Sequence, residues 1–141
     1  MFQFLDHPSE TLVEVSGASL QDVFRDAAAA LFEVMTDTSR VRKEIVVPVS
    51  LTAASREILL IEWLNRLIVI HEVESLFLAH FEIRVIEGAR PAGNWSLEAL
   101  AGGERIGENH EKRSHVKSAT FGSFEWIESR SGHVVRFVLD I

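Results

Sequence analysis

The hydrophobic positions of this chain change their spacing several times, and each change predicts a new element. Apolar and polar residues alternate over residues 11–16, which is the pattern of a half-buried strand, and Gly17 ends it. Apolar residues then recur at helical spacing from residue 20 to near residue 36. Ser19 followed by Asp22 resembles a capping box, which marks the start of this helix. The first part of the chain therefore predicts a strand followed by a helix.

A second strand and a second helix follow. Alternation over residues 45–51 predicts the strand, and Pro48 within it indicates an edge position or a bulge. The helix begins near Ser55 and carries apolar side chains around most of its circumference, which suggests burial on more than one side. The alternation over residues 77–85 that follows is the cleanest strand pattern in the chain.

The rest of the chain predicts strands separated by glycine-containing turns. The strands are residues 95–101, 116–127 and 134–140, the last two as a closing hairpin. The turns are residues 88–93, 102–103 and 131–132, and residues 105–114 form a polar loop. Two strand–helix–strand units without sequence repetition favour the α+β class. We expect a single domain over residues 1–141, with both helices on one face of a mostly antiparallel sheet.

Composition narrows the possible functions. The formal net charge is −7, which argues against a dedicated nucleic-acid binder and fits an acidic protein that meets a basic partner or holds a cation. There is no cysteine, so disulfides and thiolate zinc sites are excluded. The most apolar stretch, residues 58–81, is interrupted by charged residues, whereas a membrane span needs about 20 predominantly apolar residues. Residues 1–15 lack the basic start of a signal peptide. These features predict a soluble cytoplasmic protein.

The two ends of the chain carry the main candidate chemistry. Asp140 directly precedes Ile141, which places a side-chain carboxylate beside the α-carboxylate of the last residue. Glu10 supplies a further carboxylate near the other end. Calcium and magnesium take oxygen ligands, so these groups predict a divalent cation site if the first and last strands lie close together. The alternative is that Asp140 is an ordinary surface residue in a weak salt bridge with Arg136.

Two further candidates are less specific as single features. Asp6 and His7 stand next to the cation candidates in sequence, but Asp and His before Pro8 also commonly initiate a turn. Lys117 could contact a phosphate or a carboxylate of a partner, and its ordinary alternative is an exposed strand lysine. Residues 110–117 are locally basic, which fits either a phosphate contact or a solvated loop.

Four short segments, in matching order and spacing, resemble the archease family. They are Leu5-Asp6-His7, the Leu-Phe-Glu-Val-Met-Thr-Asp run at 31–37, the Val-Lys-Ser-Ala-Thr-Phe run at 116–121, and Leu139-Asp140-Ile141. Archeases are small protein partners of the tRNA-splicing RNA ligase of the RtcB type. The resemblance spans nearly the whole chain and implies an archease-like fold of intertwined strand–helix–strand–strand units, in which the first and last strands lie close together.

The resemblance implies a function and a set of site residues. It implies an accessory protein, not an enzyme, that promotes guanylylation and multiple turnover of a GTP-dependent ligase in tRNA splicing or RNA repair. RNA would then be contacted only through the ligase. The implied residues are Glu10, Asp140 and Ile141 for a calcium or magnesium ion, and Lys117, Asp6 and His7 for action on the partner.

The sequence departs from the family pattern at two places. Pro8-Ser9-Glu10 replaces the usual Thr-Ala-Asp, so the acidic side chain reaches one methylene further. Phe121 replaces the usual tyrosine, and Gly122 replaces the polar residue after it. Two other functions stay open. One is a small metal-dependent phosphoesterase with His7 as general base, and the other is a metal-stabilised adaptor or chaperone-like domain without catalysis.

Overall fold

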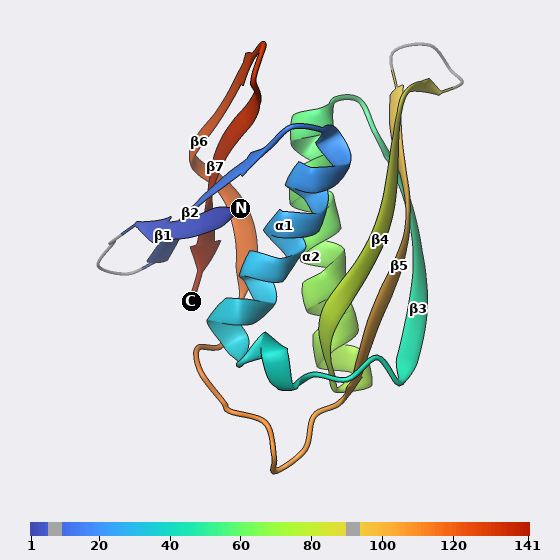
Figure 1. Cartoon of the computed structure of the whole chain (residues 1–141), viewed down its shortest axis with the longest axis vertical. Helices are drawn as coiled ribbons and strands as arrows, with labels where there is room; N and C mark the ends of the chain where they lie inside the picture. Colours follow the sequence, from blue (N-terminus) through green and yellow to red (C-terminus); the bar gives the residue numbers. More distant parts are fainter. Residues whose placement is uncertain (6–9, 90–93) are drawn as a thin grey trace.

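The structure is a computed structural model that describes residues 1–5, 10–89 and 94–141 (Figure 1). The strands are β1 (Phe2–Leu5), β2 (Glu10–Gly17), β3 (Ile45–Ala53), β4 (Leu76–Ala89), β5 (Asn94–Arg105), β6 (Ser118–Ser129) and β7 (Gly132–Asp140). The helices are α1 (Leu20–Met35), the short 3-10 helix η1 (Thr38–Arg40) and α2 (Arg56–Glu74).

The strands form two antiparallel sheets with the helices between them (Figure 1). Sheet A has the strand order β1-β2-β7-β6, and sheet B has the order β3-β5-β4. The predicted α+β class, with two helices packed on antiparallel strands, is confirmed. The expectation of one sheet with both helices on one face is wrong, because the strands divide into two sheets that cover the helix pair from opposite sides. Strand β3 lies at an edge of sheet B, as Pro48 indicated, since proline donates no ladder hydrogen bond.

Both helices begin where the sequence predicts. The Ser19 Oγ accepts a hydrogen bond from the Asp22 backbone N–H at the start of α1, and Ser55 caps α2 in the same way. The broad apolar surface of α2 is buried on several sides, with Leu59, Leu60, Ile61, Trp63, Leu64, Leu67 and Ile68 all in the core. The indole N–H of Trp63 donates to the Phe24 carbonyl of α1 at 3.1 Å, so the two helices are joined by a buried hydrogen bond.

Residues 106–117 form an irregular segment between β5 and β6, as predicted, and it is fastened to the end of α1. The backbone N–H groups of Arg113 and Ser114 donate to the carbonyls of Met35 and Val34. The Arg113 guanidinium also donates to the Glu33 carbonyl and carboxylate. A helix ends with carbonyls that have no partner within it, and this segment supplies the missing donors. These hydrogen bonds hold the residues that precede β6 in one position.

The turn predicted at Gly102-Gly103 is wrong. Both glycines lie inside β5, where Gly103 pairs with Ile45 of β3 and with Leu78 of β4. A Cβ at Gly103 would lie 1.9 Å from the Phe77 carbonyl oxygen. Close approach of two backbones favours glycine as strongly as a turn does. The sequence pattern alone therefore did not distinguish a turn from a close contact between strands.

Strand β1 was not predicted at all. It pairs antiparallel with β2 and adds an edge to sheet A. Its four residues are too few to show a clear alternation. Within the described ranges, no helix is long and apolar enough to cross a membrane.

Candidate functional site

The structure brings the two acidic ends of the chain together. Strand β7 lies between β2 and β6, and its residue Asp140 pairs with Glu10 on one side and with Ser118 on the other. Directly paired residues of antiparallel strands carry their side chains on the same face, with Cβ atoms about 4.5–5.5 Å apart. The closeness of the first and last long strands, which only the family resemblance implied, is therefore part of the fold.

The paired carboxylates are a candidate cation site. Like charges directly opposite each other in a sheet are destabilising, and a divalent cation between them would offset that repulsion. Ile141 follows Asp140 immediately, and its side chain is exposed. The described residues contain no group of three or more His, Asp or Glu side chains that could hold a metal ion. Asp6 and His7 lie outside the described residues.

Arg136 does not form the predicted alternative ion pair with Asp140 in the described part of the chain. Its guanidinium donates to Glu14 at 2.8 Å and lies 3.9 Å from Glu125. The hydrogen bond from Arg136, with a second from Gln3, holds the pKa of Glu14 below its ordinary value. Arg136 is thus engaged further along the sheet.

Lys117 contacts the end of β7 through its main chain. Its backbone N–H donates to the Asp140 carbonyl oxygen at 2.7 Å, which fixes the main chain at the start of β6. The preceding Val116 is buried, whereas the Lys117 side chain is exposed and takes part in no ion pair between described residues. The strand predicted from residue 116 begins at Ser118, so Lys117 lies just before it. The Lys117 main chain is thus joined to Asp140, and its side chain is exposed.

The whole chain is similar to known proteins. A model of the Archease protein family (MTH1598/TM1083) matches residues 2–141. The chain belongs to the archease family. It is 35% identical over 140 residues to the protein archease of Methanothermobacter thermautotrophicus, which covers 99% of this chain and 98% of that protein. It is 32% identical over 141 residues to the protein archease of Sulfolobus acidocaldarius, with the same coverage of 99% and 98%.

A solved structure also resembles this archease fold. The solution structure of Methanobacterium thermoautotrophicum protein 1598 matches with a TM-score of 0.85 at 35% identity. The match covers 99% of this chain and 98% of that chain. The similarity therefore includes both sheets and the strands that carry Glu10 and Asp140.

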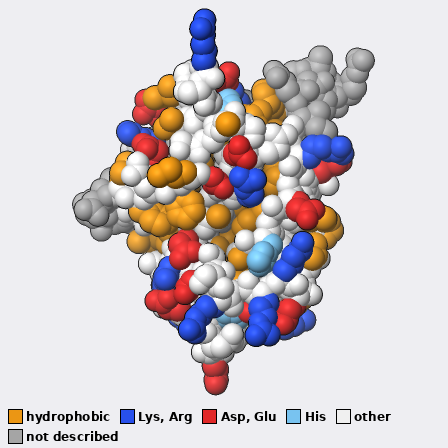
Figure 2. Space-filling model, viewed as in Figure 1, with side chains coloured by type: hydrophobic (Ala, Val, Ile, Leu, Met, Phe, Trp, Pro, Cys, Tyr) orange, Lys and Arg blue, Asp and Glu red, His pale blue; other side chains and the backbone are white. Residues whose placement is uncertain are grey.

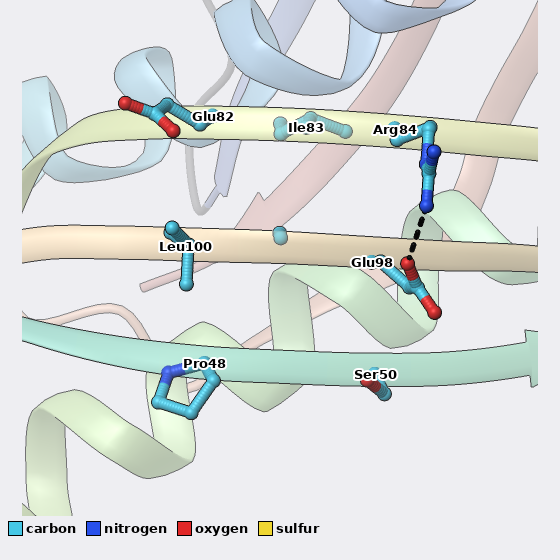
Figure 3. Close-up of a pocket in the computed structure, with 8 residues that line it drawn as sticks. Pro48, Ser50, Glu82, Ile83, Arg84, Glu98 and Leu100 are labelled. Atoms are coloured by element: carbon cyan, nitrogen blue, oxygen red, sulfur yellow. Dashed lines mark hydrogen bonds and ion pairs between the residues drawn. The ribbon is translucent and has the colours of Figure 1, made fainter.

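A surface pocket lies away from the chain ends. It has a volume of about 440 Å³ and lies on sheet B, where Pro48, Ser50, Glu82, Ile83, Arg84, Glu98, Ala99 and Leu100 line it (Figure 3). Two of its charged side chains are paired with each other, since Arg84 donates to Glu98 at 3.0 Å (Figure 3). None of the predicted site residues contributes to it. We therefore place the candidate site at the chain ends, where the titratable groups converge, and not at this pocket.

A buried acid–histidine pair was missed by the sequence analysis. His110 Nε2 lies 2.7 Å from the Glu104 carboxylate, and both residues are largely buried. The His110 Nδ1 accepts the Gly107 backbone N–H at 2.9 Å, so Nε2 carries the proton that Glu104 accepts. This hydrogen bond holds the pKa of Glu104 below its ordinary value. The pair anchors the start of the 106–117 segment, and nothing in the local sequence pattern indicated it.

Acid is expected to weaken this anchor. A carboxylate with a lowered pKa in the folded state stabilises the fold at neutral pH. That contribution is lost as the pH falls below the ordinary glutamate value of about 4.3 and through the lowered pKa. Glu104→Gln, whose amide oxygen still accepts the His110 N–H, should show a smaller fall in unfolding free energy between neutral and acid pH. Denaturant unfolding across this range would measure it, with Glu108→Gln as an exposed control. Identical pH profiles for Glu104→Gln and the unchanged protein would contradict this role.

Proposed function

We propose that this protein is an accessory activator of a GTP-dependent RNA ligase of the RtcB type. In this proposal it acts in the cytoplasm, promotes guanylylation of the ligase and allows multiple turnover in tRNA splicing or RNA repair. Membership of the archease family supports the proposal. The observation that carries it is the strand register, which pairs Glu10 with Asp140, together with the hydrogen bond that joins the Lys117 main chain to Asp140.

The proposed cation ligands are Glu10, Asp140 and the Ile141 carboxyl group, with calcium or magnesium as the ion. All are hard oxygen donors, which both ions prefer. A bound divalent cation would supply positive charge that orients and polarises phosphate oxygens. Asp6 and His7, next to Glu10 in sequence, are proposed to act on the ligase as well.

Lys117 has a different role in the proposal. Its main chain is fixed by the hydrogen bond to Asp140, so the side chain projects from a defined point. An exposed ammonium group forms strong charge-assisted hydrogen bonds with phosphate or carboxylate oxygens. We therefore assign Lys117 to a direct contact with such a group in the ligase complex.

Divalent cation binding is expected to depend on Asp140. Asp140→Ala should abolish the binding heat of calcium or magnesium, because it leaves Glu10 without its cross-strand carboxylate partner. Glu108→Ala, which removes an exposed carboxylate from the 106–117 segment, is the matched control and should bind as the unchanged protein does. Isothermal titration calorimetry measures both. An unchanged titration after Asp140→Ala would exclude the proposed cation site.

The function itself is tested by reconstitution. The protein is added to a purified RtcB-type ligase from the same organism, and covalent GMP transfer and the number of ligation turnovers are followed. We expect both to rise. The alternative phosphoesterase predicts instead that the protein alone hydrolyses phosphoesters with a divalent cation. Hydrolysis without ligase, or no stimulation of a competent ligase, would each count against the proposal.

A further inference from the structure

Strand β6 leaves the ladder of sheet A close to the candidate site. Thr120 pairs with Val138 and Glu125 pairs with Arg136, so residues 121–124 lie opposite the single residue Phe137. Ser123 within this bulge has a φ of 55°, a left-handed conformation that is uncommon for serine. Bulges occur often at sheet edges and beside functional sites, where they redirect side chains. Strand β6 is an edge strand of sheet A, so the bulge faces outward from the sheet.

The bulge presents one aromatic ring at the surface. Phe121 is 49% exposed, and its ring centroid lies 5.2 Å from that of Phe124. Phe124 is partly buried and packs against the core. The exposed ring is therefore supported by a ring that the fold holds in place. A rigid aromatic side chain costs little conformational entropy on binding and fills an apolar pocket well.

Phe121 follows the part of β6 that pairs with the end of β7. Ser118, three residues before Phe121, pairs with Asp140, and Lys117 donates its backbone N–H to the same residue. The Ile141 side chain next to them is also exposed. Hydrophobic side chains are visible at the surface on the sheet A side of the molecule (Figure 2). Protein interfaces typically combine an aromatic anchor with charged groups at its rim, which is the combination found here.

We propose that Phe121 is the aromatic anchor by which this protein docks on its partner ligase, in an apolar pocket bordered by groups that accept the Lys117 ammonium. The inference rests on the proposed function and adds the surface that provides affinity. A protein pocket is favoured over an RNA base as the occupant because carboxylates outnumber cations on the paired strands: Glu10, Glu14, Glu125 and Asp140 lie there with the single cation Arg136, and Lys117 precedes β6. Carboxylates repel the phosphate backbone that dominates nucleic-acid affinity.

The test compares two exposed apolar residues of the same strand. Ile127 lies on β6 beyond the bulge and is 52% exposed, so Ile127→Ala is the matched control for Phe121→Ala. Calorimetry with the purified ligase gives Kd, and the dependence of GMP transfer on protein concentration gives the plateau rate. Phe121→Ala should raise Kd about tenfold or more, as for an anchor residue. The plateau rate should stay unchanged because the ring positions the complex without touching the reacting groups. Ile127→Ala should change neither quantity.

Each other outcome has a definite meaning. A Kd for Phe121→Ala within twofold of the unchanged protein, or an equal loss in Ile127→Ala, would overturn the inference while leaving the proposed function intact. Binding of single-stranded RNA without ligase that Phe121→Ala removes would overturn it in favour of base stacking. If the unchanged protein neither binds nor stimulates the ligase, the proposed function fails first and the inference falls with it. Thermal unfolding of each variant confirms that the compared proteins are folded.

Discussion

Replacing Lys117 by alanine is expected to remove most of the stimulation of the ligase and leave the fold unchanged. The side chain is exposed and pairs with no described residue, so its loss should change the unfolding free energy by no more than about 0.5 kcal/mol. The loss of a desolvated charged contact in the complex costs about 2–5 kcal/mol. Multiple-turnover ligation should therefore fall about 30-fold or more. The plateau rate should fall, in contrast to the effect expected for Phe121→Ala.

A matched lysine separates this effect from a general loss of charge. Lys43 is also exposed, and its ammonium lies 3.6 Å from the Glu82 carboxylate of sheet B, away from the chain ends. Lys43→Ala should leave stimulation unchanged. Melting temperatures and ligation time courses of both variants decide the question. A folded Lys117→Ala protein with full stimulation would remove Lys117 from the site and leave the carboxylates as the remaining candidates.

Replacing Gly103 by alanine is expected to destabilise the fold severely. The added Cβ would lie 1.9 Å from the Phe77 carbonyl oxygen and 2.8 Å from the Leu78 Cα. These are backbone atoms of the neighbouring strand, so the clash is relieved only by separating β4 from β5. Overpacking of this kind costs about 3 kcal/mol or more. For a chain of this size, that corresponds to a fall in melting temperature of roughly 6–12 °C.

The control is a glycine-to-alanine substitution at a position where the added Cβ has room. A Cβ at Gly122, in the β6 bulge, would meet only the Thr120 hydroxyl oxygen at 3.5 Å. Gly122→Ala should therefore stay within about 0.5 kcal/mol of the unchanged protein. Denaturant unfolding of the two variants measures the difference. Equal stability of Gly103→Ala and Gly122→Ala would show that the β4–β5 contact adjusts more easily than its geometry indicates.

Local patterns predicted the elements whose ends are set by local contacts. Ser19 and Ser55 start the helices because their side chains accept backbone N–H groups three residues later, and such contacts can be read from spacing. The role of Gly103 was predicted wrongly because glycine is needed there by the close approach of a neighbouring strand. The local sequence does not show that approach. The interruption of β6 between Thr120 and Glu125 was missed for a related reason. A bulge is defined by the partner strand, here β7, as much as by its own residues.

The prediction of the candidate site depended on strand register, which local patterns do not contain. The acidic residues at the two ends were visible in the sequence, but their register was not. Pairing of Glu10 with Asp140 is a property of sheet A as a whole, and only the family resemblance implied it. The buried Glu104–His110 pair shows the opposite case. The two residues are only six positions apart in sequence. No periodic pattern surrounds them, so the sequence predicted ordinary polar side chains of a loop.

The position of β7 between β2 and β6 has a consequence for how the molecule is made. During synthesis β1 and β2 are the first strands to leave the ribosome, and their central partner is among the last. Sheet A is therefore closed by contacts that span most of the chain, which are slow to form because a long loop must be ordered first. Sheet B and the helices between the sheets can assemble earlier from contacts nearer in sequence. A chain interrupted before β7 lacks Asp140, so the candidate site exists only in molecules whose synthesis has reached that strand.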